Sequence, residues 1–246
     1  MRCQPLYDFM VNICSKFNQR CYLCQGAGDN PYPLCSGCEG NLPWLSTPCQ
    51  RCALPLPFDG PLCSQCQQSP PPFDLVAAPW AYDFPLDAAI KRFKHRQDWP
   101  MGHLLAERLA AWLAYRFEEG LVPAQQLLPV PLAAARQRKR GFNQAQMLGQ
   151  WLSKRLAIPL CPRALVRTKH TPSQQGLGLA ARQQNLQAAF ELGPGAQVAG
   201  QHVALVDDVL TTGATARALA ALLLKAGARR VDVYCLARTP AAGPVT

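Results

Sequence analysis

The sequence predicts an α/β protein with a mostly parallel sheet, helices on both faces of that sheet, and a small cysteine-rich domain in front of it. Two observations support this prediction. From residue 75 onwards, short apolar runs alternate with segments whose apolar residues recur every three or four positions. Ten of the twelve cysteines, in contrast, lie before residue 67. The proline-rich segment 67–74 separates the two regions, so we expect domains at 1–72 and 73–246.

The cysteine-rich region contains an internal duplication. Eight cysteines form four Cys-x-x-Cys pairs, and a shift of 28 residues places the first two pairs on the last two: Cys21, Cys24, Cys35, Cys38, Cys49, Cys52, Cys63 and Cys66. Four thiolates complete a tetrahedral zinc site and leave no open position for water, so we expect structural zinc in a double zinc ribbon. Redox or disulfide chemistry is the alternative. The spacing leaves open whether each half binds its own ion or the pairs cross.

The remaining cysteines and the N-terminus indicate where the protein works. We expect buried free thiols at Cys3, Cys14, Cys161 and Cys235. No apolar run reaches the roughly 18 residues that a membrane helix needs, so membrane insertion is not expected. The first 17 residues contain polar positions and no small-residue cleavage site, which argues against a secretory signal. We therefore expect a cytoplasmic protein with reduced cysteines.

The charge is concentrated in the larger region. Residues 1–72 contain four cations and four anions, so the whole net charge of +10 lies in residues 73–246. A basic domain of this kind attracts polyanions. Charge alone does not decide between phosphorylated metabolites and nucleic acid.

The larger region is predicted to alternate between strands and helices. Strands are expected at residues 75–82, 126–132, 203–206 and 231–236. Helices are expected at residues 86–96, 103–117, 143–157 and 215–226, with Asn143 as an N-cap and Gly227 ending the last helix. Residues 99–102 are expected to break the chain between the first two helices. In such a sheet, ligands bind beyond the carboxyl ends of the strands.

Residues 203–215, with the sequence VALVDDVLTTGAT, combine the features of a sugar-phosphate site. Four apolar residues predict a buried strand, and Asp207 and Asp208 follow at its carboxyl end. A loop of small and hydroxylated residues then leads into a helix, whose N-terminus favours an anion. The two carboxylates can accept hydrogen bonds from ribose hydroxyls or hold a cation.

Over its thirteen residues this segment resembles the phosphoribosyl pyrophosphate (PRPP) binding motif of type I phosphoribosyltransferases. The resemblance implies a phosphoribosyltransferase-like fold in which Asp207 and Asp208 are the catalytic pair and contact the ribose hydroxyls. It assigns PRPP and phosphate binding to the residues that follow: Val209, Leu210, Thr211, Thr212, Gly213, Ala214 and Thr215. It also implies magnesium, which would bridge pyrophosphate and ribose oxygens.

Further motifs look like those of the ComF/GntX family. They are the double zinc ribbon, the Pro-Val-Pro of 129–131, the run RQRKRGFNQ at 136–144, and the spaced Arg, Thr, Gln and Asn residues of 167–185. Members of that family are associated with natural competence and with DNA uptake and utilisation, and the GntX branch with gluconate or carbon utilisation. The resemblance covers nearly the whole chain.

The resemblance also implies roles for two polar segments. The basic run would form the loop that binds pyrophosphate, through Arg136, Arg138, Lys139 and Arg140. A solvated basic face or a nucleic-acid patch is the alternative. The segment 171–185 resembles the lid of these enzymes, with Gln174, Arg182 and Asn185 as its functional residues. An ordinary solvated loop is the alternative.

Two functional hypotheses follow from the sequence. The first is a phosphoribosyltransferase that transfers a pentosyl group from magnesium-bound PRPP. The second is a non-catalytic accessory protein that binds nucleic acid and retains a PRPP-sensing pocket, with single-stranded DNA or a DNA-processing protein as its partner. The sequence identifies no acceptor substrate, and a shared fold does not fix the reaction.

Overall fold

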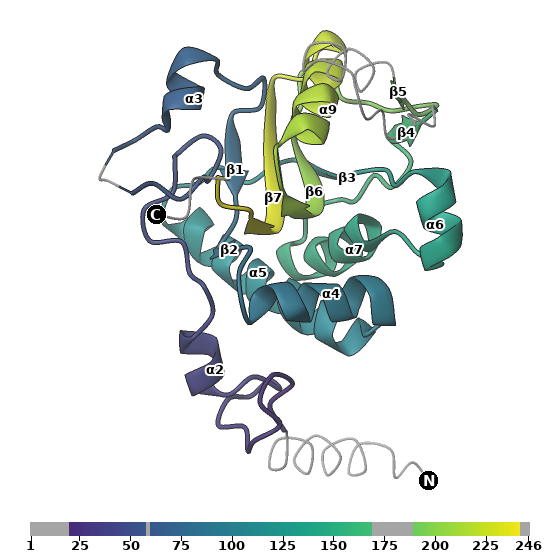
Figure 1. The fold of residues 1–246 in the computed structure, drawn as a ribbon. Helices are drawn as coiled ribbons and strands as arrows, with labels where there is room; N and C mark the ends of the chain where they lie inside the picture. The colour runs from purple at the N-terminus through teal and green to yellow at the C-terminus, as the bar shows by residue number, and fades with distance from the viewer. Residues whose placement is uncertain (1–19, 58–59, 169–188, 242–246) are drawn as a thin grey trace, which may run out of the picture.

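A five-stranded parallel sheet organises the protein (Figure 1). The computed structural model describes residues 20–57, 60–168 and 189–241. Within them the sheet consists of β1 (Leu75–Ala77), β2 (Trp80–Ala81), β3 (Gln126–Pro129), β6 (His202–Leu210) and β7 (Arg230–Arg238). The order is β1-β7-β6-β3, with β2 also pairing with β7, and every pairing is parallel. The predicted mostly parallel sheet is confirmed.

Helices cover both faces of this sheet, as the sequence predicts. Successive side chains of a strand point to opposite faces. Ala204, Val206 and Tyr234 pack with α4 (Leu86–Arg96), α5 (Trp99–Glu118) and α7 (Gln144–Leu156) in one core cluster. Val203, Leu205 and Val233 pack with α9 (Ala214–Lys225) in the other. Figure 1 shows α9 on one side of the sheet and α4, α5 and α7 on the other.

The two halves of the cysteine-rich region join different core clusters. The first half carries α2 (Ser36–Gly40), and its Cys21, Leu34 and Leu42 pack with α4, α5 and α7. The second half carries α3 (Ser64–Gln68), and its four cysteines pack with the α9 cluster. In Figure 1, α2 and α3 accordingly lie at opposite ends of the molecule.

Helices α4 and α7 match the sequence prediction closely, including Asn143 as the N-cap of α7. Residues 99–102 do not break the helices, because they form the first turn of α5. The Asp98 carboxylate accepts a hydrogen bond from the Met101 N–H at 3.1 Å, and Pro100 stands in the first turn, where proline is tolerated. The predicted break is therefore wrong, and the separation of α4 from α5 consists of residues 97 and 98 alone.

The strand predictions are right in place but differ in length. The expected strand at 75–82 is divided into β1 and β2 near Pro79, which has no N–H to donate to a neighbouring strand. The strand expected at 126–132 ends at Pro129, and the one expected at 203–206 continues to Leu210. That continuation follows from the pairing of Val209 with Ala237 on β7.

Sequence reasoning missed a small antiparallel pair outside the main sheet. It consists of β4 (Leu165–Arg167) and β5 (Phe190–Leu192), and each strand has only three residues. A three-residue strand is too short to show a periodic pattern.

Among the described residues, no helix combines the length and apolar character needed to cross a bilayer.

Candidate functional site

The two acidic residues lie inside β6, near its carboxyl end. Asp208 is buried, with 4% of its surface exposed, and Asp207 is partly buried. Each carboxylate accepts a hydrogen bond from the next backbone N–H: Asp208 N–H to Asp207 at 2.9 Å, and Val209 N–H to Asp208 at 2.7 Å. These bonds hold both side chains at the edge of the sheet where ligands of parallel sheets bind.

The loop after β6 has the geometry of a strand-to-helix turn. Gly213 has a φ of 76°, a conformation that a residue with a side chain rarely adopts, and it begins α9. The Thr212 hydroxyl accepts a hydrogen bond from the Ala214 N–H at 3.4 Å. Thr211 and Thr212 are exposed, and Thr215 is partly buried. Thr215 in the first turn of α9 lines one pocket with the two aspartates, so the helix N-terminus would stabilise an anion there.

A pocket of about 190 Å³ lies beside these elements. Its lining residues come from the ends of β3 and β6 and from α4, α6 (Ala134–Arg140), α7, α9 and β4: Lys94, Val130, Pro131, Leu132, Arg136, Arg140, Gln144, Arg167, Asp207, Asp208 and Thr215. Four of them are cations and two are carboxylates. Such a pocket is suited to a ligand that carries several negative charges and also presents hydroxyl groups.

The pocket contains only some of the residues that the sequence proposed. Asp207, Asp208, Thr215, Arg136 and Arg140 line it. Arg138 is exposed and does not belong to its lining, and the segment expected to be a loop forms the helix α6, which ends at Gly141 with a φ of 82°. Val209 and Leu210 are buried in β6, and nothing is described of the Lys139 side chain. Gln174, Arg182 and Asn185 lie outside the described residues.

Lys94 is one of the pocket residues that sequence reasoning missed. It lies on α4, more than 100 positions before the acidic pair, and its Nζ lies 3.0 Å from the Asp208 carboxylate. Both side chains are largely buried, so solvent weakens this ion pair less than it would at the surface. The only signal in the sequence is that Lys94 directly follows the core residue Phe93 in an amphipathic helix. That signal does not show which partner the lysine meets.

The acidic pair is electrostatically unusual. Burial and then the neighbouring Asp208 carboxylate raise the pKa of Asp207 to about 8, against smaller opposing effects of the Asp208 backbone N–H and the Lys94 ammonium. A carboxyl group with this pKa holds its proton at neutral pH in the free protein. A ligand that needs the charged carboxylate must therefore displace that proton.

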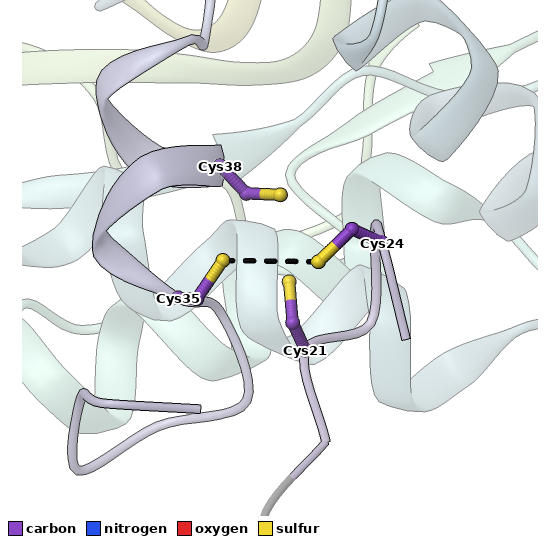
Figure 2. Close-up of side chains that lie close together, drawn as sticks. All are labelled: Cys21, Cys24, Cys35 and Cys38. Atoms are coloured by element: carbon purple, nitrogen blue, oxygen red, sulfur yellow. Dashed lines mark hydrogen bonds between the residues drawn. The ribbon is translucent and has the colours of Figure 1, made fainter. Parts of the chain in front are cut away.

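The eight paired cysteines form two separate quartets, which answers the question of how the pairs combine. Cys21, Cys24, Cys35 and Cys38 make one quartet, and Cys49, Cys52, Cys63 and Cys66 make the other, with the sulfur atoms of each within 4.8 Å of one another. Figure 2 shows the first quartet, whose sulfur atoms point toward a common centre.

The sulfur positions fit zinc and not disulfides. Zn–S bonds of about 2.3 Å in a tetrahedron place the sulfurs about 3.8 Å apart. The Cys24 and Cys35 sulfurs are 3.8 Å apart, and those of Cys52 and Cys63 are 3.7 Å apart. A disulfide would require about 2.0 Å. The quartets are therefore structural zinc sites, one in each ribbon.

Backbone geometry repeats with the same 28-residue shift and favours ionisation of the first cysteine in each quartet. Gln25 and Ala53, each directly after a cysteine pair, both have positive φ values, of 62° and 53°. Burial opposes ionisation of the first cysteine of each quartet, but hydrogen bonds from the surrounding backbone outweigh it and lower the pKa of Cys21 to about 6 and that of Cys49 to about 7. Both thiols are thereby prepared to bind a metal ion.

The two unpaired cysteines of the described residues have different environments. Cys235 is buried on β7 in the core cluster of α9, as expected. Cys161 is only partly buried, and its thiol donates a hydrogen bond to the Gln126 side chain at 3.4 Å. Cys3 and Cys14 lie outside the described residues.

Comparison with known proteins connects both halves of the chain to described domains. A model of the phosphoribosyl transferase domain matches residues 119–245, and a model of the double zinc ribbon domain matches residues 16–67. Competence protein F of Haemophilus influenzae is 38% identical over 229 residues, covering 90% of this chain and 98% of that protein.

Two further relatives have related names. DNA utilization protein YhgH of Escherichia coli K12 is 34% identical over 221 residues, covering 89% of this chain and 96% of that protein. Competence protein ComFC of Bacillus subtilis is 32% identical over 114 residues, covering 46% of this chain and 44% of that protein.

Proposed function

This chain belongs to the ComF/GntX family, in which a double zinc ribbon precedes a phosphoribosyl transferase domain, and we propose that it binds magnesium-PRPP in the pocket at the end of β6 and acts in competence or DNA utilisation. One observation supports PRPP as the ligand. Two carboxylates at the end of a parallel strand face a pocket with four cations, beside the N-terminus of α9. The biological setting rests on the names of the relatives.

The pocket, together with the loop residues 211–214 beside it, would match each part of PRPP. Asp207 and Asp208 would accept hydrogen bonds from the ribose hydroxyls, and residues 211–215 would donate to the 5′-phosphate. Arg136, Arg140 and Arg167 would bind the pyrophosphate, because guanidinium groups match phosphate oxygens in geometry and charge. Lys94, now paired with Asp208, stands where it can also reach a ligand phosphate.

The donor set also fits magnesium. Magnesium in proteins is bound by one or two carboxylates together with substrate phosphates, and the pocket offers two carboxylates where a phosphorylated ligand would lie. When bound, the ion would supply positive charge that offsets the negative charge of the pyrophosphate. The contribution of the chain itself is to orient the sugar and to stabilise the departing negative charge through its arginines.

Isothermal titration of the full-length protein with PRPP and magnesium tests this proposal. We expect binding that needs magnesium and that weakens at least about tenfold in the double variant Asp207→Ala, Asp208→Ala, since hydrogen bonds to charged groups contribute about 1.5–3 kcal/mol each. Arg136→Ala should also weaken binding, and Arg138→Ala, on the same helix but outside the pocket, is the matched control. Equal binding by wild type and the double variant would disprove the proposal. Pyrophosphate release with a panel of bases then separates an enzyme from a sensor.

A second candidate function is direct binding of single-stranded DNA. It is favoured by the exposed Arg138 and Arg136 on α6 and by the concentration of net charge in residues 73–246. DNA affinity should fall steeply between 50 and about 200 mM salt, because phosphate contacts release counterions. Here Arg138→Ala should weaken binding, although it leaves PRPP affinity unchanged. An affinity that stays constant across this salt range rules out phosphate contacts.

A further inference from the structure

Arg238 is a buried arginine that the PRPP proposal does not use. It ends β7, and only 7% of its surface is exposed. Its described hydrogen bonds all go to backbone carbonyls. The Nε–H donates to the carbonyl of Cys52 at 2.9 Å, and Nη1 donates to the carbonyls of Leu210 at 3.1 Å, Thr211, and Thr239 at 2.6 Å. A buried guanidinium with this many partners is held in one place.

These bonds join two parts of the chain that are far apart in sequence. Cys52 belongs to the second zinc quartet, whereas Leu210 and Thr211 begin the loop that leads into α9. The guanidinium is planar and its donors form a rigid fork, so the carbonyl of Cys52 and those of the loop must keep a fixed relation to each other. The Arg238 side chain is therefore a direct mechanical connection between the second ribbon and the loop.

Zinc controls one end of this connection. The turn that carries Cys52 closes with a hydrogen bond from Ala53 N–H to the Cys49 carbonyl at 2.8 Å, and Ala53 has a φ of 53°. Left-handed backbone at a non-glycine residue costs free energy and persists only where its surroundings hold it. Metal binding to Cys49 and Cys52 supplies that hold, because four thiolates around one ion fix the turn. Loss of the ion would remove this restraint on the carbonyl of Cys52.

We propose that Arg238 is a positioning residue through which zinc in the second ribbon keeps the loop 211–213 ordered for its anionic ligand. This inference rests on the proposed function in that the ligand is PRPP, but the coupling itself exists in the ligand-free protein. Coupling between two binding sites is reciprocal. Zinc in the second ribbon therefore raises PRPP affinity, and PRPP raises the zinc affinity of that ribbon by the same free energy.

The first ribbon provides the matched control. Cys21, Cys35 and Cys38 pack in the core cluster of α4, α5 and α7, and the first ribbon also contacts the rest of the chain through residues such as Arg92 and Arg108. None of the described hydrogen bonds links it to residues 209–213. Loss of the first zinc is therefore expected to leave the loop unchanged.

Amide hydrogen exchange of the full-length protein without PRPP measures the coupling directly. Exchange at residues 211–213 should accelerate about tenfold in the variant Arg238→Met. The same acceleration is expected in the double variant Cys63→Ser, Cys66→Ser, which removes the second zinc but keeps Cys52. It should be unchanged in Cys21→Ser, Cys24→Ser. Arg238→Lys keeps the charge but cannot bond both ends at once, so it should behave like Arg238→Met. Unchanged exchange in Arg238→Lys or in the Cys63, Cys66 variant would overturn the inference.

Titration with magnesium-PRPP separates this inference from the proposed function. If wild type binds PRPP, the Arg238 variants and the Cys63, Cys66 variant should bind it about tenfold more weakly, while the Cys21, Cys24 variant binds as wild type does. Equal affinities would overturn the coupling and leave PRPP binding intact. Accelerated exchange in a protein that binds no PRPP would instead refute the proposed function and support the connection through Arg238.

Discussion

At the scale of single residues, Asp207 gives the pocket a distinct pH dependence. Its carboxyl pKa of about 8 lies above the ordinary value because of burial and of Asp208 beside it. The folded protein thus binds more protons at this group than the unfolded chain between about pH 4 and pH 8. The stability that Asp207 contributes is fully present below about pH 4, and it is lost as the pH rises through about 8. Asp207→Asn should flatten that slope.

The same group predicts how PRPP affinity responds to pH. A charged carboxylate accepts hydrogen bonds from ribose hydroxyls more strongly than a neutral carboxyl group does, so ligand binding at pH 7 should release up to about 0.9 protons from Asp207, as follows from a pKa of about 8. Affinity should accordingly increase from pH 6.5 to about 8.5. Titration in two buffers of different ionisation enthalpy measures the released protons.

Two variants control this measurement. PRPP itself titrates near neutral pH, so the informative quantity is the difference between wild type and Asp207→Asn, which should release fewer protons. Lys94→Met removes a cation that lowers the pKa of Asp207, and it should shift the pH dependence to higher values. Identical proton release by wild type and Asp207→Asn would contradict the assignment of this carboxylate to the ribose.

Local and distant residues of the pocket differ in how far the sequence predicts them. Asp207, Asp208 and Thr215 lie within one short segment, where residue types and spacing alone indicate a ligand. Lys94 and Arg238 reach the same region only because α4 and β7 pack against β6. A single sequence contains no record of which surface of a helix meets which strand. Both residues were therefore missed as partners of the acidic segment and its loop.

At the scale of elements, Asn143 connects α7 to the wall of the pocket. Its Oδ1 accepts a hydrogen bond from the Ala145 N–H at 3.0 Å, and its Nδ2 donates to the carbonyl of Val130 at 3.1 Å. Asn143→Ala should lower the free energy of unfolding by about 0.5–2 kcal/mol, as expected for loss of an N-cap. Urea unfolding measures this change. Asn143→Asp keeps the acceptor but not the donor, so its stability should lie between those of wild type and Asn143→Ala. Equal stability of all three proteins would show that the cap is dispensable.

The elements that the sequence predicted well are those whose ends have a local chemical cause. Helix α7 starts at a capping asparagine, and α9 ends just before Gly227, which has a φ of 89°. The strand end was predicted wrongly because β6 runs on to Leu210 beside its partner β7, a tertiary effect that overrides the polarity of the two aspartates. The basic run became α6 because arginine, lysine, glutamine and alanine all favour a helix, which the prediction of a loop ignored.

At the scale of the whole molecule, the duplicated ribbons are equal in sequence pattern but not in surroundings. In the first quartet Cys24 is exposed and Cys35 and Cys38 are partly exposed, whereas all four cysteines of the second quartet are buried. The sequence predicts the 28-residue repeat and the ligands, because both are local. It cannot predict this difference, which arises from the separate core clusters that the two halves join.

Zinc release should therefore occur in two phases. A chelator reaches a metal only when the surrounding chain opens, and a buried site needs a larger opening than an exposed one. A difference of about 1.4 kcal/mol in that opening corresponds to about tenfold in rate. We expect two zinc ions per chain, one released at least about tenfold faster than the other, as followed by a chelator that changes colour on binding zinc.

The quartet variants assign the phases to the ribbons. Cys21→Ser, Cys24→Ser should retain one zinc ion and show only the slow phase, because its remaining site is the buried one. Cys63→Ser, Cys66→Ser should retain one ion and show only the fast phase. The opposite assignment, or a single phase in wild type, would mean that burial of the ligands does not control access to the metal. A single phase would instead fit control by the thiolates themselves, because their backbone hydrogen bonds are alike in the two ribbons.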